Sequence, residues 1–325
     1  MRTTFVETLC DLAGRDERVW LLTADLGYSV LETFRDRFPS RFVNVGIAEQ
    51  NLIGVAAGLA RCGKVPFVYS IANFPTLRCL EQIRVDVCYH RCDVKIVAVG
   101  GGFTYATQGY THHGVEDLAI LRTLPGMTVV APADPVETRL ATRAVAARPG
   151  PCYLRLGKAN EPVVHAAEPA FQLGRAITVR RGRDVTLVST GGMLAECLSV
   201  AERLCGEGIE ARVVSMHTLK PLDEEAVLRA ARETGGIVTA EEHSVTGGLG
   251  SAVADVIAQA GLRCGFFRKF GVPDEVYHRV GGQEYMRGLC GDLYQTVAAA
   301  CGFAGLSCEA ASGRERALVT GTDAT

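Results

Sequence analysis

The sequence lacks an excess of charge of either sign and lacks long apolar runs, and each absence excludes a class of protein. Its 325 residues carry a formal net charge of −2 at pH 7, so no basic field points to nucleic acid or to an acidic membrane surface. No uninterrupted apolar stretch reaches membrane-spanning length. The N-terminal segment has the pattern of an amphipathic helix rather than of a signal peptide. We therefore expect a soluble, cytoplasmic protein that binds neither nucleic acid nor membranes.

Paired metal-ligating motifs are also lacking, although the chain contains 12 cysteines. Cys88 and Cys92 lie one helical turn apart, but no Cys-x-x-Cys pair or matching Cys/His pair accompanies them. Most of the others, such as Cys62 and Cys197, lie in apolar helical contexts, where cysteine acts as a small hydrophobe. The sequence therefore favours free structural thiols over a metal site in this chain.

What the sequence does contain is a globular composition, with 48% hydrophobic and 22% charged residues. Short β-branched runs alternate with helical patterns, which predicts an α/β fold of two doubly wound domains, each a mostly parallel sheet with helices on both faces. The strands expected in the first domain are Val19–Thr23, Phe42–Val45, Val65–Ser70, Val94–Val99, Thr128–Ala131 and Cys152–Leu156. The helices expected there cover residues 31–38, 48–61, 76–90, 116–123 and 135–147.

A Pro/Ala-rich segment with weak periodicity separates the two expected domains. We predict a first domain over residues 1–160, a linker over 161–175, a second domain over 176–304 and a loose tail over 305–325. The strands expected in the second domain are Val185–Thr190, Ala211–Ser215, Ile237–Ala240 and Leu262–Phe267. Its expected helices cover residues 192–206, 222–233, 248–260 and 283–302.

Glu49 stands just ahead of a helical segment that carries no charge from Leu52 to Ala60. Burial there would raise the pKa of its carboxyl group, so Glu49 needs a partner. The free amides of the first helical turn are one choice. The other is a ligand nitrogen that shares a proton with the acid, as in thiamine diphosphate. A carboxylate at the pyrimidine N1′ of that cofactor favours the tautomer that takes the proton from thiazolium C2.

Further candidate groups follow the expected strands, whose carboxyl ends bind ligands in α/β sheets. Phe74 could stack on a flat heterocycle between Ile71 and Leu77, although such rings more often belong to the core. The Gly-rich segment 100–114 carries His112 and His113, which can exchange protons near neutral pH. A solvated loop is the alternative for this segment.

Groups that could bind phosphate follow the first and last strands of the first domain. Ser29, close to Asp25, could supply a hydroxyl and Lys158 a positive charge. In the second domain, the residues around Asp223 suit a turn into a helix. The glycines after Glu241 open a helix that could accept an anion, although helix capping explains both segments adequately.

Taken in order over residues 4–303, these motifs resemble those of the transketolase family of thiamine-diphosphate enzymes. The first-domain motifs are Thr-Ala-Asp-Leu-Gly-Tyr-Ser, Asn-Val-Gly-Ile-Ala-Glu-Gln-Asn, Tyr-Ser-Ile-Ala-Asn-Phe, Thr-His-His-Gly-Val-Glu-Asp-Leu and Leu-Pro-Gly-Met-Thr-Val-Val-Ala-Pro-Ala-Asp. Lys-Pro-Leu-Asp and Glu-Glu-His with its Gly-Gly-Leu-Gly follow in the second domain. The resemblance implies that residues 1–160 are the pyrimidine-binding domain and residues 176–304 the family's C-terminal domain.

The resemblance also implies roles for individual residues. It makes Glu49 and His112 catalytic, Glu49 at the pyrimidine N1′ and His112 at a substrate hydroxyl. It places Phe74 on the cofactor's pyrimidine, with Ile71 and Leu77 at flanking positions that are aromatic in transketolases. The implied substrate-binding residues are Asp25, Ser29, Gln108, His112, His113 and Lys158.

Three of these residues depart from the family pattern and leave the substrate class open. Lys158 stands where an arginine is usual, and a lysine binds phosphate as a point charge rather than as a fork. Gln108 replaces an aspartate that contacts the acceptor's α-hydroxyl. His113 is more similar to the corresponding residue of deoxyxylulose-phosphate synthases than to that of transketolases.

One family motif is missing. In the family, Mg²⁺ holds the diphosphate and is bound by a Gly-Asp-Gly motif and a later Asn in a separate N-terminal domain. No Gly-Asp-Gly occurs in this chain, and the Cys-Gly-Asp-Leu at Cys290 lacks the second glycine and falls in an expected helix. The resemblance therefore implies an α2β2 heterotetramer in which this chain self-dimerises. An N-terminal transketolase-like partner subunit would supply the Mg²⁺ ligands.

The implied activity is that of a transferase that works only with this partner. It would transfer a two-carbon ketol unit from a ketose, expected to be phosphorylated, to an aldehyde. One alternative is the β-subunit of a 2-oxo-acid dehydrogenase E1 component, and another is acyl transfer as in deoxyxylulose-phosphate synthases. A noncatalytic assembly subunit is a further alternative.

Overall fold

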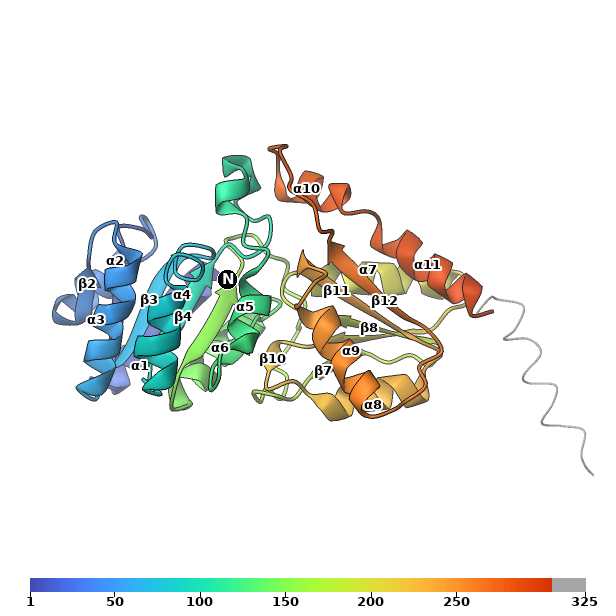
Figure 1. Cartoon of the computed structure of the whole chain (residues 1–325), viewed down its shortest axis with the longest axis horizontal. Coiled ribbons are helices and arrows are strands. Elements are labelled where there is room, and N and C mark those ends of the chain that lie inside the picture. The colour runs from blue at the N-terminus through green and yellow to red at the C-terminus, as the bar shows by residue number, and fades with distance from the viewer. Residues whose placement is uncertain (306–325) are drawn as a thin grey trace, which may run out of the picture.

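The computed structural model describes residues 1–305 and contains two α/β sheets that lie side by side (Figure 1). The first sheet has the order β10-β5-β6-β4-β3-β1-β2, and all its pairs are parallel except that of β10 with β5. Its strands are β1 (Val19–Thr23), β2 (Phe42–Asn44), β3 (Val65–Ile71), β4 (Lys95–Val99), β5 (Thr128–Val130), β6 (Cys152–Leu156) and β10 (Thr218–Lys220). The second sheet has the order β12-β11-β8-β9-β7, with only β7 antiparallel. Its strands are β7 (Ile177–Arg180), β8 (Val185–Ser189), β9 (Ala211–Ser215), β11 (Ile237–Ser244) and β12 (Phe267–Val272).

Helices cover both faces of each sheet, and the inner strands β4, β6 and β8 are buried on both sides, unlike the edge strands β2 and β7. On the first sheet, α1 (Arg2–Arg15), α2 (Glu32–Arg37) and α6 (Pro135–Ala147) pack on one face. The helices α3 (Glu49–Arg61), α4 (Leu80–Gln82) and α5 (Asp117–Thr123) lie on the other, with the π-helical segment η2 (Ile83–Tyr89). On the second sheet, α7 (Met193–Gly206) and α11 (Leu293–Phe303) cover one face, and α8 (Glu224–Glu233) and α9 (Leu249–Gln259) the other. This arrangement confirms the expected fold class.

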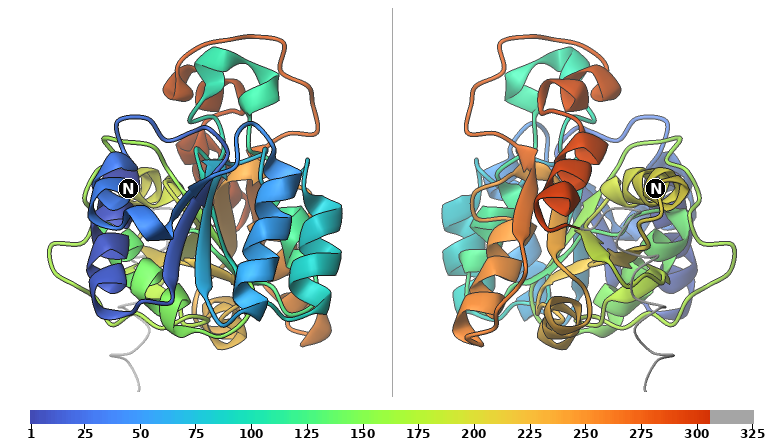
Figure 2. Two further views of the ribbon diagram at one scale, coloured as in Figure 1. Left: turned by 90° about the vertical axis from the view of Figure 1, so that its left-hand side faces the viewer. Right: turned by 90° about the vertical axis from the view of Figure 1, so that its right-hand side faces the viewer.

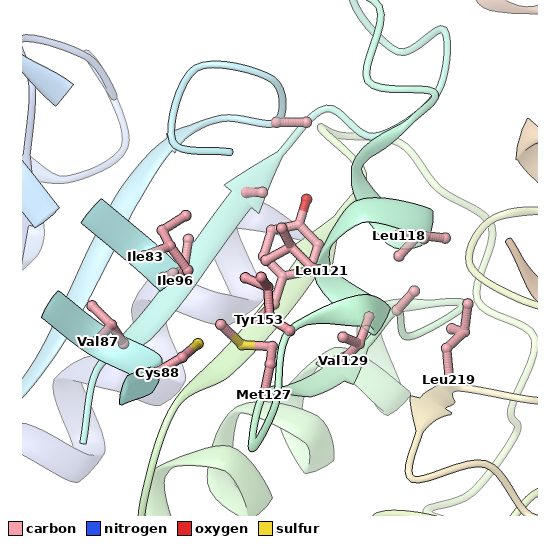
Figure 3. Packing of buried hydrophobic residues seen from close by; sticks show 14 of the residues in the cluster. Ile83, Val87, Cys88, Ile96, Leu118, Leu121, Met127, Val129, Tyr153 and Leu219 are labelled. Atoms are coloured by element: carbon pink, nitrogen blue, oxygen red, sulfur yellow. The ribbon is translucent and has the colours of Figure 1, made fainter. Parts of the chain in front are cut away.

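The hydrophobic core is continuous between the two sheets. One buried cluster joins η2, β4 and α5 to β10 and to the α8–α9 face of the second sheet. Figure 3 shows Tyr153 at the middle of this packing, with Leu121 and Met127 beside it and Leu219 of β10 nearby. The two halves of the chain therefore share one hydrophobic core, and the second half also contributes β10 to the first sheet.

The sequence misplaced several elements, each for a local reason. The expected strand at 262–267 is instead a connection, because Gly265 passes too close to the Gly235 carbonyl oxygen for a side chain, and β12 begins only at Phe267. The helix expected at 283–302 breaks into α10 (Gln283–Leu289) and α11, since Gly291 has φ +112° and Asp292 caps the second helix. The Cys-Gly-Asp-Leu segment therefore lies at a break and not inside a helix.

Two short edge strands, β7 and β10, were not anticipated, because each pairs antiparallel with a partner that is distant in the sequence. The helix expected at 76–90 begins only at Leu80. Most of the expected tail, residues 306–325, lies outside the described part of the chain. Within residues 1–305, no helix is both long and apolar enough to cross a membrane.

Candidate active site

Glu49 occupies the first turn of α3 and is only 2% exposed. The preceding residue, Ala48, supplies no side-chain cap, so the acid itself faces the positive end of the helix dipole. Its Oε2 accepts a hydrogen bond of 2.6 Å from Nη1 of Arg78, whose side chain is 46% exposed. The acid therefore has a cationic partner that neither sequence alternative included.

Arg78 also joins Glu49 to the predicted stacking ring. Its guanidinium carbon lies 4.7 Å from the centroid of the Phe74 ring. The centroids of the Phe74 and His112 rings are 5.2 Å apart at an interplanar angle of 66°. The structure thus brings together the acid, the ring and the histidine that the sequence proposed, although they come from three separate segments.

A cleft of about 330 Å³ opens beside Phe74 and Arg78, whereas Glu49 and His112 are not among its lining residues. It is lined by Asn73, Phe74, Leu77, Arg78, Tyr110, Thr111, His113 and Glu116. His113 is 2% exposed, and neither of its ring nitrogens has a hydrogen-bond partner among residues 1–305. Burial, with a contribution from the neighbouring His112, lowers the pKa of His113. A neutral imidazole that can both donate and accept a hydrogen bond therefore lines this cleft.

These features fit an aromatic ligand that forms hydrogen bonds, such as an aminopyrimidine. A buried acid and a half-buried ring are the groups that such a ring would satisfy, and the imidazole nitrogens of His113 remain for the hydroxyls of a second ligand. Within the described residues, no group of three or more His, Cys, Asp or Glu side chains is placed to hold a metal ion.

The predicted phosphate-binding residues make separate local contacts. The Asp25 carboxylate accepts hydrogen bonds from the Tyr28 hydroxyl at 2.8 Å and from Asn44 at 3.2 Å, and these bonds lower its pKa. Ser29 is exposed, and its main-chain N–H donates a hydrogen bond to the Glu32 carboxylate at 2.9 Å. Lys158 instead lies with its Nζ 4.9 Å from the centroid of the Tyr105 ring.

The remaining predicted residues differ in how close they come to the cleft. Leu77 lines it and is 45% exposed. Ile71, at the end of β3, is half-buried and is not among the lining residues of the cleft. Gln108 is exposed at the end of the short turn η3 (Ala106–Gln108), before the turn η4 (Tyr110–His112).

The helix start after Glu241 does not offer the anion site that the sequence suggested. The Glu241 carboxylate accepts hydrogen bonds from the main-chain N–H groups of Leu249 and Gly250, at 2.7 and 2.8 Å. Burial raises the pKa of this carboxyl group to about 7. The first turn of α9 is therefore occupied by a side chain of the protein itself. Asp223 caps α8 as expected, accepting from Ala226 at 3.0 Å.

Sequence reasoning missed several residues at this site, including Arg78, Phe103, Arg155 and Glu242. Each acts across a large separation in the chain, such as the 139 residues between Phe103 and Glu242. Arg78, Glu81 and Arg84 recur at a spacing of three residues, which fits either an ion-pair set or a surface that meets a partner chain. Phe103 lies in the Gly-rich segment 100–114 and Glu242 in the Glu-Glu-His motif, but neither residue is itself predicted to act at the site.

Comparison with known proteins identifies the family. The chain matches the transketolase pyrimidine binding domain over residues 1–163 and the transketolase C-terminal domain over residues 174–286. It is 43% identical to the 6-deoxy-6-sulfo-D-fructose transketolase subunit SqwH of Clostridium sp. (strain MSTE9), covering 88% of each chain. It is 41% identical to an apulose-4-phosphate transketolase subunit of Phocaeicola vulgatus, covering 84% of this chain and 88% of that one.

The solved structures agree with this assignment. One described as a split gene transketolase, inactive beta4 tetramer, has a TM-score of 0.83 and 41% sequence identity. The alignment covers 93% of this chain and 97% of that one. On the evidence of its motifs, its fold and these relatives, the chain belongs to the transketolase family.

Proposed function

We propose that this chain is the C-terminal subunit of a two-component, thiamine-diphosphate-dependent transketolase. Its relatives of similar length are themselves described as transketolase subunits, which supports an active site completed by a second polypeptide. In this proposal an N-terminal subunit supplies the Mg²⁺ and diphosphate contacts, and the pair forms an α2β2 heterotetramer in the cytoplasm. The domain boundaries near residues 160 and 176 belong to the same proposal.

The observation that carries the proposal is the buried carboxylate of Glu49, which Arg78 links to the Phe74 ring at the edge of the cleft that His113 lines. When bound, thiamine diphosphate would supply the nucleophilic carbon that carries the ketol unit. Glu49 would hold a proton at the pyrimidine N1′, and Phe74 would hold the flat ring in place. His112 and His113 would orient the substrate hydroxyls.

The proposed substrates are ketoses with an anionic end group. The two relatives named above act, by their names, on a sulfonated and on a phosphorylated sugar. Lys158 and Ser29 would contact the anionic group, and Asp25 and Gln108 the hydroxyls. Sulfonated, phosphorylated and uncharged ketoses should therefore be compared as donors, with transfer expected from the anionic ones.

Reconstitution tests the main proposal. The chain should be mixed with an N-terminal transketolase subunit that carries Gly-Asp-Gly, thiamine diphosphate and Mg²⁺. Only the pair is expected to transfer a ketol unit to an aldehyde. Glu49→Gln should lower kcat by about 100-fold or more without preventing assembly.

A matched control is available in α6, where Glu137 is also a buried glutamate in a first helical turn. Glu137→Gln should leave kcat near its wild-type value. Transfer by the chain alone, or full activity of Glu49→Gln, would contradict the proposal, and the second result would indicate a noncatalytic assembly role.

A second candidate activity is acyl transfer from a 2-oxo acid, as in deoxyxylulose-phosphate synthases. The presence of His113 next to His112 favours it. Pyruvate as donor, in place of a ketose, distinguishes the two activities. Reductive acylation of a lipoyl acceptor by the pair would instead identify the β-subunit of a 2-oxo-acid dehydrogenase E1 component.

A further inference from the structure

The loop that carries the predicted substrate-binding histidines is closed at its base by two glycines. Gly102 and Gly114 exchange main-chain hydrogen bonds of 2.7 and 3.0 Å and form an isolated antiparallel bridge. The residues between them include Gln108, His112 and His113. The geometry at this base therefore sets where these three side chains can lie.

One strand of the base is held by a side chain of the second domain. Glu242, near the end of β11, is 7% exposed, and its Oε1 accepts a 2.6 Å hydrogen bond from the main-chain N–H of Phe103. Its other oxygen accepts from Arg287 Nε at 2.8 Å, and Gln283 Nε2 donates to both oxygens at 3.0 Å. A Cβ atom on Gly102 would lie 2.5 Å from the Glu242 carboxyl carbon. The Glu242 carboxylate therefore contacts the loop directly, and Arg287 and Gln283 hold it in that position.

The other strand of the base is also tied to the second domain. Arg155 Nη2 donates to the carbonyl oxygen of Gly114 at 2.6 Å and to that of Glu242 at 2.9 Å. The main-chain N–H of Ser244 donates to the Val115 carbonyl oxygen at 2.8 Å. Both strands of the loop base are therefore anchored to the end of β11.

Phe103 connects this anchorage to His113. Its ring is fully buried and meets the His113 ring edge-on, with centroids 5.1 Å apart at 88°. The ring of Tyr277, from the second domain, lies 5.7 Å from Phe103 at 83°. Met286 of α10 belongs to the same buried cluster. Figures 1 and 2 show α10 and the η3–η4 loop together at one end of the molecule.

We propose that the C-terminal domain positions the substrate-binding loop, with Glu242 and Tyr277 acting on His113 through Phe103. The inference rests on the proposed role of His113 as a substrate contact. Glu242 and Tyr277 are positioning residues, since they are placed to act on the loop rather than on substrate. Glu49 and Phe74 belong to other segments, and the loop residue whose ring lies near Phe74 is His112, at 5.2 Å, whereas the anchorage acts through Phe103 on His113. Cofactor binding should therefore not depend on this anchorage.

The test compares Glu242→Ala with a matched control, Asp223→Ala, each in the full chain assembled with its N-terminal partner. Asp223 is 4% exposed and also accepts a main-chain N–H from another segment, that of Ala176 at 2.8 Å, but it holds the residue just before β7 instead of the loop. Hydrogen exchange of the amides in residues 100–114, steady-state kinetics with the ketose donor and calorimetric cofactor affinity should be measured.

Glu242→Ala should accelerate exchange at Phe103 and Gly114 and raise KM for the ketose about tenfold, because small misplacements of positioning groups are costly. Cofactor affinity should stay at the wild-type value. Tyr277→Ala should give the same pattern, whereas Tyr277→Phe, which retains the ring, should keep the loop amides protected. Asp223→Ala should change none of these quantities.

The proposal is overturned if Glu242→Ala matches Asp223→Ala in loop exchange and in KM, or if its only effect is weaker cofactor binding. If the wild-type assembly transfers no ketol unit at all, the proposed function fails. The exchange comparison then still decides whether the second domain anchors the loop.

Discussion

Arg78 and Glu49 form an ion pair with unequal burial: the Glu49 side chain is 3% exposed and that of Arg78 is 46% exposed, with 2.6 Å between Nη1 and Oε2. The arginine reaches the acid from the solvent side and lies over the Phe74 ring at 4.7 Å. The same carboxylate is the proposed partner of the cofactor. A cofactor ring and the Arg78 side chain would therefore compete for the Glu49 carboxylate.

This competition gives a prediction for Arg78→Gln. In the chain without cofactor, the change should lower the free energy of unfolding by about 1–3 kcal/mol, because a buried carboxylate loses its charged partner. In the cofactor-loaded assembly the loss should be smaller, since a ring nitrogen replaces the arginine. Chemical denaturation of both forms checks this, with Arg84→Gln, from an exposed pair whose atoms are 3.9 Å apart, as control. Equal losses in both forms would contradict the proposed competition.

Phe74→Ala should weaken cofactor binding, because the flat ring loses its stacking partner. We expect the Kd for thiamine diphosphate, measured by calorimetry on the assembled pair, to rise about 10- to 100-fold. Phe171→Ala is the control: this half-buried ring stacks on His217 at a centroid distance of 4.0 Å and does not line the cleft. An unchanged Kd for Phe74→Ala would remove Phe74 from the cofactor site.

His165 predicts a pH dependence of stability. Its Nε2 lies 2.9 Å from Oε1 of Glu137, and this hydrogen bond raises the pKa of His165 above its usual value of 6.5. The folded state therefore binds the proton more tightly than the unfolded state. The stabilisation is fully present below pH 6.5 and is lost as the pH rises through the folded-state pKa.

The measurement is the difference in Tm between the wild type and His165→Gln from pH 6 to pH 9. The wild type should be the more stable at the acidic end, and the difference should shrink as the pH rises. A difference that grows with pH would show that the sign of the pKa shift is wrong.

Gly102→Ala should destabilise the protein through a steric clash. The position has φ +67°, and an added Cβ would lie 2.5 Å from the Glu242 carboxyl carbon. Gly126 is the control, with φ +77° and no atom of the part of the chain that the structure describes within 4 Å of an added Cβ. Gly126→Ala therefore introduces backbone strain without a clash. We expect Gly102→Ala to cost about 1–3 kcal/mol more than Gly126→Ala. Glu242→Ala should relieve part of that excess in the double variant, and an equal cost at both glycines would count against the clash.

Local patterns predicted the elements that have strong end signals. Helix α6 matches its expected range of 135–147 because Asp134 caps it, accepting from Glu137 N at 2.7 Å, and Pro135 opens it. Strands β1, β6 and β9 also have the expected bounds. The break at Gly291 was missed because the apolar pattern on both sides of it resembled one continuous helix.

The site was predictable only where its residues lie inside short motifs. Glu49, Phe74 and His112 are predicted to be site residues from the family motifs around them, and in the structure Arg78 links Glu49 to Phe74, whose ring lies near that of His112. The partner of Glu49 is 29 residues away, and the carboxylate that holds Phe103 is 139 residues away. Such contacts depend on the order of strands in the two sheets, and periodicity along the chain does not encode them.

Strand β10 links the two halves of the chain, because it lies in the second half of the sequence and in the first sheet of the structure. It lies between β9 and α8 in the sequence, yet it extends the first sheet by pairing with β5. Separating the halves by proteolysis or recombination would expose an open edge at β5 and the apolar surface that Leu219 covers. Each half on its own would therefore be prone to aggregate.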